Sequence, residues 1–112
     1  MAEENAESGA VVARCLSDNA ARFAALGQAL RARAPAVVVT NARGSSDHCA
    51  LYLKYLIEIT LGLPCASIGP SIASLYRTAM QLDRAVAISI SQSGRSPDIV
   101  EAQRAARRGG AM

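Results

Sequence analysis

The chain has 112 residues, of which 51% are hydrophobic and 19% are charged, and this composition excludes disordered and fibrous proteins. Its formal net charge is +3, but only 4% of its residues are aromatic. Nucleic-acid binding requires a basic face with interleaved aromatic side chains, so we expect no nucleic-acid partner.

The sequence also bears on location and on cysteine chemistry. No apolar stretch approaches the roughly 20 residues that cross a bilayer, and the acidic start MAEENAESG lacks the order of a secretory signal. We therefore expect a cytoplasmic protein with no membrane partner. Cys15, Cys49 and Cys65 are odd in number and form no CxxC pair, which predicts buried free thiols and neither a disulfide framework nor a metal site.

The first part of the chain is predicted to be helical. Glu7 to Arg33 is rich in alanine and carries apolar residues at helical spacings, which predicts one or two helices. Pro35 ends this pattern, so residues 1–35 are expected to form an N-terminal helical segment and residues 36–112 a separate domain. Ala36 to Thr40 follows as a short β-branched run, typical of a strand covered on both faces.

The next elements alternate between turns, helices and strands. Asn41 to Ser46 is predicted to be a glycine-containing turn, and Asp47 to Leu61 a long helix. The stretch CASIG, residues 65–69, gives a second short strand, and Ser71 to Leu82 a further helix.

The last third repeats the strand, turn and helix order. Ala85 to Ser91 is the third predicted strand, and Ser96 and Pro97 are expected to cap and begin a helix that ends at Gly109. Apolar strands that alternate with helices predict an α/β fold, a parallel sheet of about three strands between two helical layers.

Two polar loops follow the first and third predicted strands. ARGSSD and SQSGRSPD both contain glycine and serine and both open a helix, and the carboxyl ends of parallel strands meet at one edge of the sheet. Unpaired N–H groups, the helix dipole and serine hydroxyls favour an oxyanion there, most simply a phosphate. Gly44 and Gly94 would let the backbone approach it.

A simpler interpretation is that Ser46 and Ser96 are only helix caps, but Ser45, Ser91 and Ser93 exceed what capping requires. The motifs GxxxxGK[ST] and GxGxxG are absent, which argues against a nucleotide triphosphate or a dinucleotide.

The two loops also carry a family resemblance. ARGSSDHCALYLKYLIE (residues 42–58) and ISQSGRSPDIVEA (residues 90–102) resemble the sugar isomerase (SIS) domain family. The similarity is closest to the isomerase half of glutamine–fructose-6-phosphate aminotransferase and to glucosamine-6-phosphate deaminase-type proteins. Arg95 stands where the aminotransferase usually has glutamate, and SGRSPD is more typical of stand-alone, two-lobed relatives. The resemblance to the SIS family implies a flavodoxin-like sheet and a phosphorylated sugar as ligand. The residues that it implies for binding this ligand are Gly44, Ser45, Ser46, Ser91, Gln92, Ser93 and Ser96.

The resemblance also implies parts that this sequence does not contain. It implies five strands in each lobe and two lobes, so we interpret the chain as an N-terminal fragment of the first lobe. The family's acid–base residues lie mostly beyond it, which leaves the catalytic residues unknown and the chain alone catalytically incomplete. Among the candidates Asp47, His48 and Glu101, only His48 is a weak candidate for catalysis, and the carboxylates are expected to be first-turn or solvated residues. No metal or organic cofactor is implied.

The helix that contains CALYLKYLIEITL, residues 49–61, is apolar almost all round apart from Lys54 and Glu58. Either a second SIS lobe or homodimer partner covers its outer side, or the N-terminal helices do.

We therefore expect a sugar-phosphate-binding domain from an enzyme of amino-sugar metabolism. The parent reaction would be aldose–ketose isomerisation of fructose 6-phosphate or glucosamine 6-phosphate, with amino transfer or deamination. The alternatives are a sugar-phosphate-sensing module without catalysis and an inactive truncated product.

Overall fold

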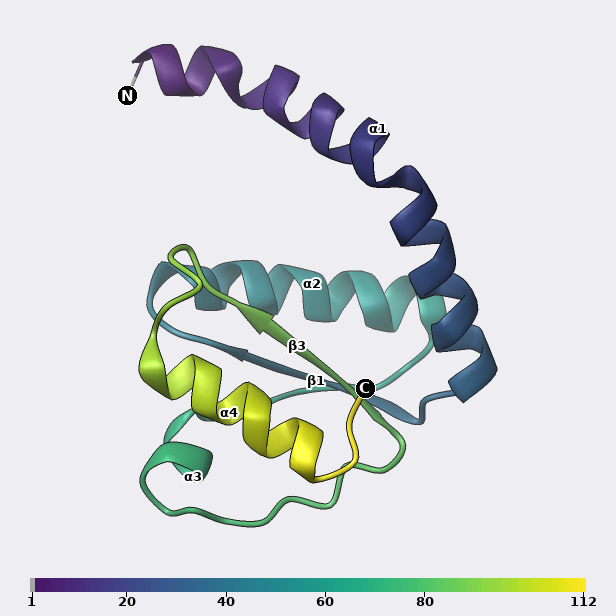
Figure 1. Ribbon diagram of the computed structural model, residues 1–112, viewed down its shortest axis with the longest axis vertical. Coiled ribbons are helices and arrows are strands. Elements are labelled where there is room, and N and C mark those ends of the chain that lie inside the picture. The colour runs from purple at the N-terminus through teal and green to yellow at the C-terminus, as the bar shows by residue number, and fades with distance from the viewer. Residues whose placement is uncertain (1) are drawn as a thin grey trace. The chain divides into compact units, whose positions relative to one another are not determined.

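The computed structural model describes residues 2–112, with side chains from residue 6 onward. The chain divides into two compact units, Met1–Ala34 and Pro35–Met112 (Figure 1). The first unit is a single helix, α1 (Ala2–Arg33), where the sequence predicted one or two helices from Glu7. Alanine and long straight side chains have high helix propensity, which accounts for its 32 residues.

The second unit is built on a three-stranded parallel sheet in the order β2-β1-β3. The strands are β1 (Val37–Ala42), β2 (Cys65–Ser67) and β3 (Ala85–Ile90). Both outer strands pair with β1 in parallel. The backbone of Met112 extends this pattern on the outer edge of β3, donating to the Ala85 oxygen (3.0 Å) and accepting from the Ala87 nitrogen (2.9 Å).

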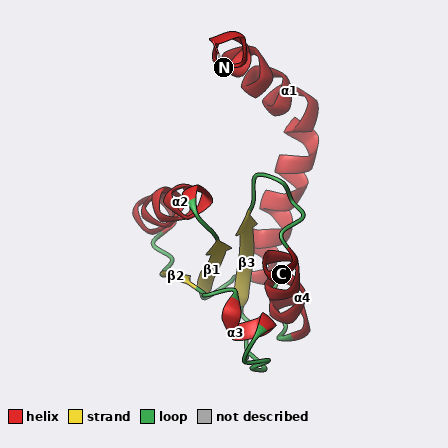
Figure 2. Cartoon of the chain, turned by 90° about the vertical axis from the view of Figure 1, so that its left-hand side faces the viewer, coloured by secondary structure: helices red, strands yellow, loops and turns green. Residues whose placement is uncertain are grey.

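Helices cover both faces of the sheet, which confirms the predicted three-layer α/β arrangement. The helix α2 (Ser45–Leu61) lies on one face, and α4 (Pro97–Arg108) lies on the other with the short α3 (Ser71–Ser74) (Figure 2). Successive residues of β1 pack in two different apolar clusters, because successive side chains of a strand point to opposite faces of the sheet. Val39 packs in the cluster that includes Ala106 of α4, and Val38 packs in the cluster that includes Ile57 of α2.

A charged pair attaches α2 to the start of β2. Lys54 Nζ lies 3.0 Å from a Glu58 carboxylate oxygen and donates to the Cys65 carbonyl at 2.7 Å. The same Glu58 oxygen accepts the Cys65 backbone N–H at 3.1 Å. The hydrogen bond with Lys54 and that from the Cys65 N–H lower the pKa of Glu58, and the hydrogen bond with Glu58 raises the pKa of Lys54. Lys54 and Glu58, the two charged residues of this otherwise apolar helix, therefore connect α2 to β2.

The predicted helix over Ser71 to Leu82 is wrong beyond its first turn, since α3 ends at Ser74. Arg77 adopts a left-handed backbone with a φ of 51°, which helical residues do not adopt. This residue interrupts the helical hydrogen-bond pattern, and no further helix forms before β3 begins at Ala85.

Three smaller expectations also need correction. Asn41 belongs to β1 and not to the turn, because β1 continues through Ala42. The helix α2 begins at Ser45, two residues before the predicted start. Cys15 and Cys49 are exposed, and only Cys65 is buried as predicted; burial raises the pKa of its thiol.

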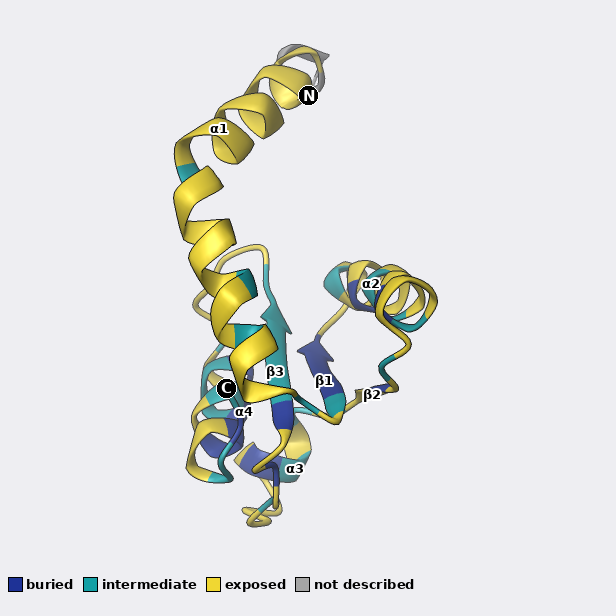
Figure 3. Ribbon diagram, turned by 90° about the vertical axis from the view of Figure 1, so that its right-hand side faces the viewer, coloured by how far each residue is buried: buried dark blue, intermediate teal, exposed yellow. Residues whose placement is uncertain are grey.

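The outer side of α2 is exposed within this chain (Figure 3). Large apolar side chains face away from the sheet, among them Tyr52, Tyr55 and Ile59, of which Ile59 is 78% exposed. Only Ala50 and Ile57 of this helix are buried. Among the described residues, no helix is both long and apolar enough to cross a membrane.

Candidate functional site

The two serine-rich loops meet at a small pocket at the carboxyl ends of β1 and β3. These strands are neighbours in register up to Ala42 and Ile90, so the loops that follow them leave the sheet side by side. The pocket has a volume of about 210 Å³. Every residue predicted to bind phosphate lines it: Gly44, Ser45, Ser46, Ser91, Gln92, Ser93 and Ser96. The remaining lining residues, Arg43, Ile90 and Ile99, were not predicted.

The first loop is shaped by Gly44. Its φ of 58° and ψ of −134° lie in a region that is accessible essentially only to glycine. Gly44 also occupies the N-cap position of α2, so the interpretation of Ser46 as a cap is wrong. Ser45 and Ser46 lie in the first turn of the helix, and neither hydroxyl caps it.

The second loop uses two serines to hold its own backbone. Ser91 Oγ accepts the Gly94 N–H at 3.1 Å, and Ser93 Oγ accepts the Arg95 N–H at 3.2 Å. These two N–H groups are thus bound within the loop, whereas each serine keeps its hydroxyl proton for donation. Ser96 occupies the predicted N-cap position of α4, but its side chain makes no capping hydrogen bond.

A partly buried hydrogen-bond network joins the carboxyl ends of β1 and β3 to α4. Asn41 Nδ2 donates to Ser89 Oγ at 2.7 Å, and the Ser89 hydroxyl donates to Gln103 Oε1. Gln103 Nε2 donates to the Ala87 carbonyl at 3.3 Å, which joins α4 to β3. Asn41 and Ser89 are register partners, each two residues before its loop, so the network fixes the ends of both strands. The buried Asn41 Oδ1 accepts no hydrogen bond.

Sequence reasoning missed this network, although Asn41 and Ser89 give a signal. Each is a polar residue inside an otherwise apolar run, and buried polar groups are costly unless they are hydrogen-bonded to one another. Two such residues near the ends of neighbouring parallel strands favour mutual contact.

An ion pair joins the two loops at the pocket. The Arg43 guanidinium, which follows β1, donates from Nη1 to Oδ2 of Asp98 in the first turn of α4. Burial alone would raise the pKa of Asp98, but the hydrogen bonds from Arg43 and from the Ile99 N–H lower it overall. This pairing of Asp98 with Arg43 was not predicted from the sequence.

The candidate acid–base residues lie elsewhere. His48 and Asp47 are exposed on the first turns of α2, and neither lines the pocket. Glu101 is half-buried on α4 and pairs with Arg108 at 2.6 Å, so it is not simply a solvated residue. In the described part of the chain, no cluster of His, Cys, Asp and Glu could hold a metal ion.

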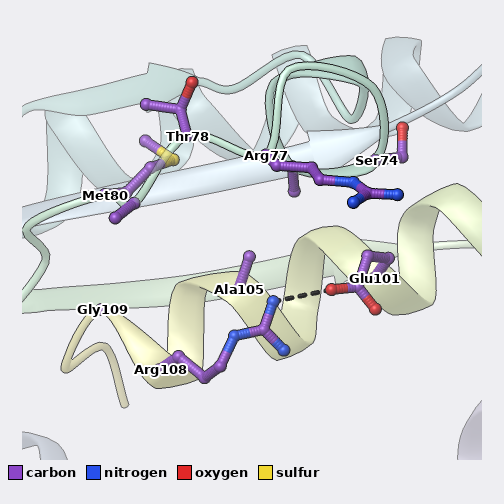
Figure 4. A pocket seen from close by; sticks show the side chains of 10 residues that line it. Ser74, Arg77, Thr78, Met80, Glu101, Ala105, Arg108 and Gly109 are labelled. Carbon is purple, nitrogen blue, oxygen red and sulfur yellow. Dashed lines mark hydrogen bonds and ion pairs between the residues drawn. The ribbon is translucent and has the colours of Figure 1, made fainter.

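A larger pocket lies on the same face of the sheet as α4, with a volume of about 580 Å³. Figure 4 shows Arg108 and Glu101 joined on α4, with Arg77 and Ser74 across from them. A third pocket, of about 390 Å³, is lined by Ser89 of β3, by residues of α4 that include Gln103, and by Ser91 and Gly94 of the second loop, so it shares Ser91 with the small pocket. Neither His48 nor any serine of the first loop lines these two pockets.

Comparison with solved structures gives a match that covers most of this chain. The chain is similar to the crystal structure of a "putative phosphosugar isomerase" from Silicibacter pomeroyi DSS-3, at 50% sequence identity and a TM-score of 0.90. The match covers 94% of this chain, and the chain spans 32% of the length of that protein. No protein-family model and no curated protein matches the sequence.

At this identity and TM-score the two proteins share the same α/β fold. The similarity also supports the resemblance to a sugar isomerase family that the loop sequences predicted. It does not distinguish the aminotransferase from the deaminase-type branch.

Proposed function

We propose that the pocket between the two loops binds the phosphate group of a phosphorylated sugar. The observation that carries this proposal is the convergence of seven predicted residues, 45 or more positions apart between the loops, on one pocket of about 210 Å³. The chain then corresponds to the first part of a phosphosugar isomerase-type SIS domain.

The chemistry of the lining supports an anion of this kind. Ser91 and Ser93 retain hydroxyl protons after accepting the loop N–H groups, and the hydroxyls of Ser45 and Ser46 are not used as caps. The starts of α2 and α4 both adjoin the pocket, and their dipoles favour negative charge.

The same proposal extends to the substrate and the reaction of the parent protein. The parent protein would act on fructose 6-phosphate or glucosamine 6-phosphate, through aldose–ketose isomerisation with amino transfer or deamination. Such chemistry needs a carboxylate, lysine or histidine within hydrogen-bond reach of the sugar carbons. No lysine, histidine or carboxylate is among the residues that line the pocket. The described chain is therefore proposed to bind the sugar phosphate, with catalytic groups supplied from outside it.

The exposed apolar side of α2 is the basis for proposing a protein partner. Its tyrosines and isoleucine are proposed to be covered by a second lobe or by a second subunit of a cytoplasmic homodimer.

The binding proposal is tested by a thermal-shift titration with fructose 6-phosphate, glucosamine 6-phosphate, inorganic phosphate and unphosphorylated glucose. A ligand that binds only the folded state raises the melting temperature, by about 2.7 kcal/mol of added stability at a hundredfold excess over its Kd. We expect the phosphorylated ligands to act and glucose to have no effect. Ser93→Ala should lower the shift, because it removes a hydroxyl donor from the pocket.

The matched control is Ser17→Ala, a serine of α1 whose hydroxyl bonds only within that helix, to Arg14 and Asp18. Each variant is compared with its own melting temperature without ligand. The proposal fails if no phosphorylated sugar shifts the wild type, or if Ser93→Ala responds to ligand as fully as Ser17→Ala does.

A further inference from the structure

Arg43 is the one charged side chain among the residues that line the small pocket. The other lining residues are serines, glycine, glutamine and isoleucines. A guanidinium offers several N–H donors in a planar fork that matches the oxygens of a phosphate group. The pocket therefore contains a cation suited to the ligand proposed above.

Arg43 is not free of other interactions. Its Nη1 donates to Asp98 Oδ2, so a carboxylate already holds one side of the guanidinium. The Arg43 side chain is 67% exposed and that of Asp98 is 21% exposed, which leaves the arginine mobile and the carboxylate partly fixed. Asp98 belongs to the first turn of α4, next to the lining residues Ser96 and Ile99.

We propose that Arg43 recognises the charge of the phosphate group and that Asp98 is a built-in competitor for the same guanidinium. This inference rests on the proposed function of the pocket. When the pocket is empty, the ion pair joins the loop after β1 to the start of α4. When an anion enters, Arg43 turns part of its donor fork to the ligand, and the Asp98 carboxylate competes with the ligand for the same N–H donors.

The arrangement has a consequence that a simple phosphate cradle does not have. Removing a carboxylate from the site strengthens anion binding, whereas removing the arginine weakens it. The effect of Asp98 depends on Arg43, because the carboxylate competes through that side chain. Two single variants and their combination therefore separate this arrangement from general repulsion.

The test is calorimetric titration of the full chain with fructose 6-phosphate and with inorganic phosphate, at one fixed low salt concentration. Asp98→Asn should lower the Kd about two- to fivefold, since exposed ion pairs are worth no more than that. Arg43→Gln should raise the Kd about tenfold, as expected for loss of a charge-assisted hydrogen bond. In the Arg43→Gln background, Asp98→Asn should give no further gain.

Arg84→Gln is the matched control for the loss of one positive charge, because Arg84 is exposed, precedes β3 at the end of the strand opposite the small pocket, and lines none of the three pockets. It should leave the Kd within about twofold of the wild type, since screening weakens the field of distant surface charges. Melting temperatures without ligand show whether each variant is folded.

The outcomes distinguish the two proposals. If the wild type binds but Arg43→Gln binds equally well, or if Asp98→Asn does not strengthen binding, the competitor proposal fails and the pocket assignment stands. If the gain from Asp98→Asn persists without Arg43, repulsion alone explains it and the proposal is again overturned. If neither the wild type nor Asp98→Asn binds a phosphorylated ligand, both proposals fail.

Discussion

Two of the pockets that α4 helps to line, those of about 580 and 210 Å³, differ in a way that their sizes do not reveal. The pocket of about 580 Å³ contains none of the residues that the loop sequences single out, whereas the pocket of about 210 Å³ contains all of them. The large pocket is lined mainly by residues of α3, α4 and the segment between α3 and β3. The small pocket lies where two neighbouring parallel strands end, the usual position of ligands in such sheets.

The glycines of the two pockets show the same contrast. A Cβ at Gly44, which lines the small pocket, would meet no atom within 4 Å, so this positive-φ glycine serves backbone conformation and leaves open space. A Cβ at Gly109, in the wall of the large pocket, would instead collide with the Met80 carbonyl oxygen. The backbone at Gly44 thus leaves open space that a ligand could occupy, whereas the backbone at Gly109 packs directly against the Met80 carbonyl group.

The largest effect on stability is expected from Gly109→Ala. The new methyl group meets backbone, which cannot move aside as a flexible side chain would, so the free energy of unfolding should fall by about 3 kcal/mol. Urea denaturation measures this loss. Gly9→Ala on α1 is the control, since a Cβ there meets nothing within 4 Å, and it should not destabilise the chain.

In the folded fraction of Gly109→Ala, the response to phosphorylated sugars should persist, because the small pocket is not altered. Loss of that response in protein that remains folded would mean that the wall of the large pocket contributes to binding. The contrast between the two pockets would then be wrong.

A smaller effect on stability is expected from Ser96→Ala. A serine that caps a helix costs about 1 kcal/mol when replaced by alanine, but the Ser96 side chain makes no capping bond. The loss in unfolding free energy should therefore be only a few tenths of a kcal/mol. The shift in melting temperature with fructose 6-phosphate should decrease, because Ser96 lines the small pocket.

This variant also tests the simpler interpretation of the serines. A loss of about 1 kcal/mol with an unchanged response to ligand would identify Ser96 as a cap and nothing more. Ser17→Ala provides the comparison for a serine outside both pockets.

Much of this fold could be predicted from local patterns in the sequence. The run AVAISI and the signal of Ser96, Pro97 and Gly109 predicted β3 and α4 closely, because capping and turn residues act within a few positions. The segment after Ser74 could not be predicted in the same way. Its apolar spacing is helical, but α3 ends at Ser74 and Arg77 has a left-handed backbone, and the helix propensities of the residues do not indicate this break.

The pocket shows the same division between local and non-local information. Serines and glycines in each loop could be read locally, and the rule that parallel strands end at one edge brought the two loops together. The pairing of Arg43 with Asp98 joins residues 55 positions apart, and nothing in either loop specifies it. The exposure of Cys15 and Cys49 is a similar case, since it depends on which helix faces the sheet covers.

The smallest effect is expected from the ion pair in the large pocket. The hydrogen bond from Arg108 lowers the pKa of Glu101 below its ordinary value of 4.5, so this carboxylate supports the folded state above that value. Its contribution is lost as the pH falls through the lowered pKa, because the unfolded chain then binds more protons than the folded one. Glu101→Gln should make the fall in melting temperature between about pH 5 and pH 3 slightly shallower, and Arg108→Gln should do the same by removing the partner. A curve for Glu101→Gln parallel to that of the wild type would contradict the assigned pairing. Both variants should retain the full response to fructose 6-phosphate at pH 7, because neither Glu101 nor Arg108 lines the small pocket.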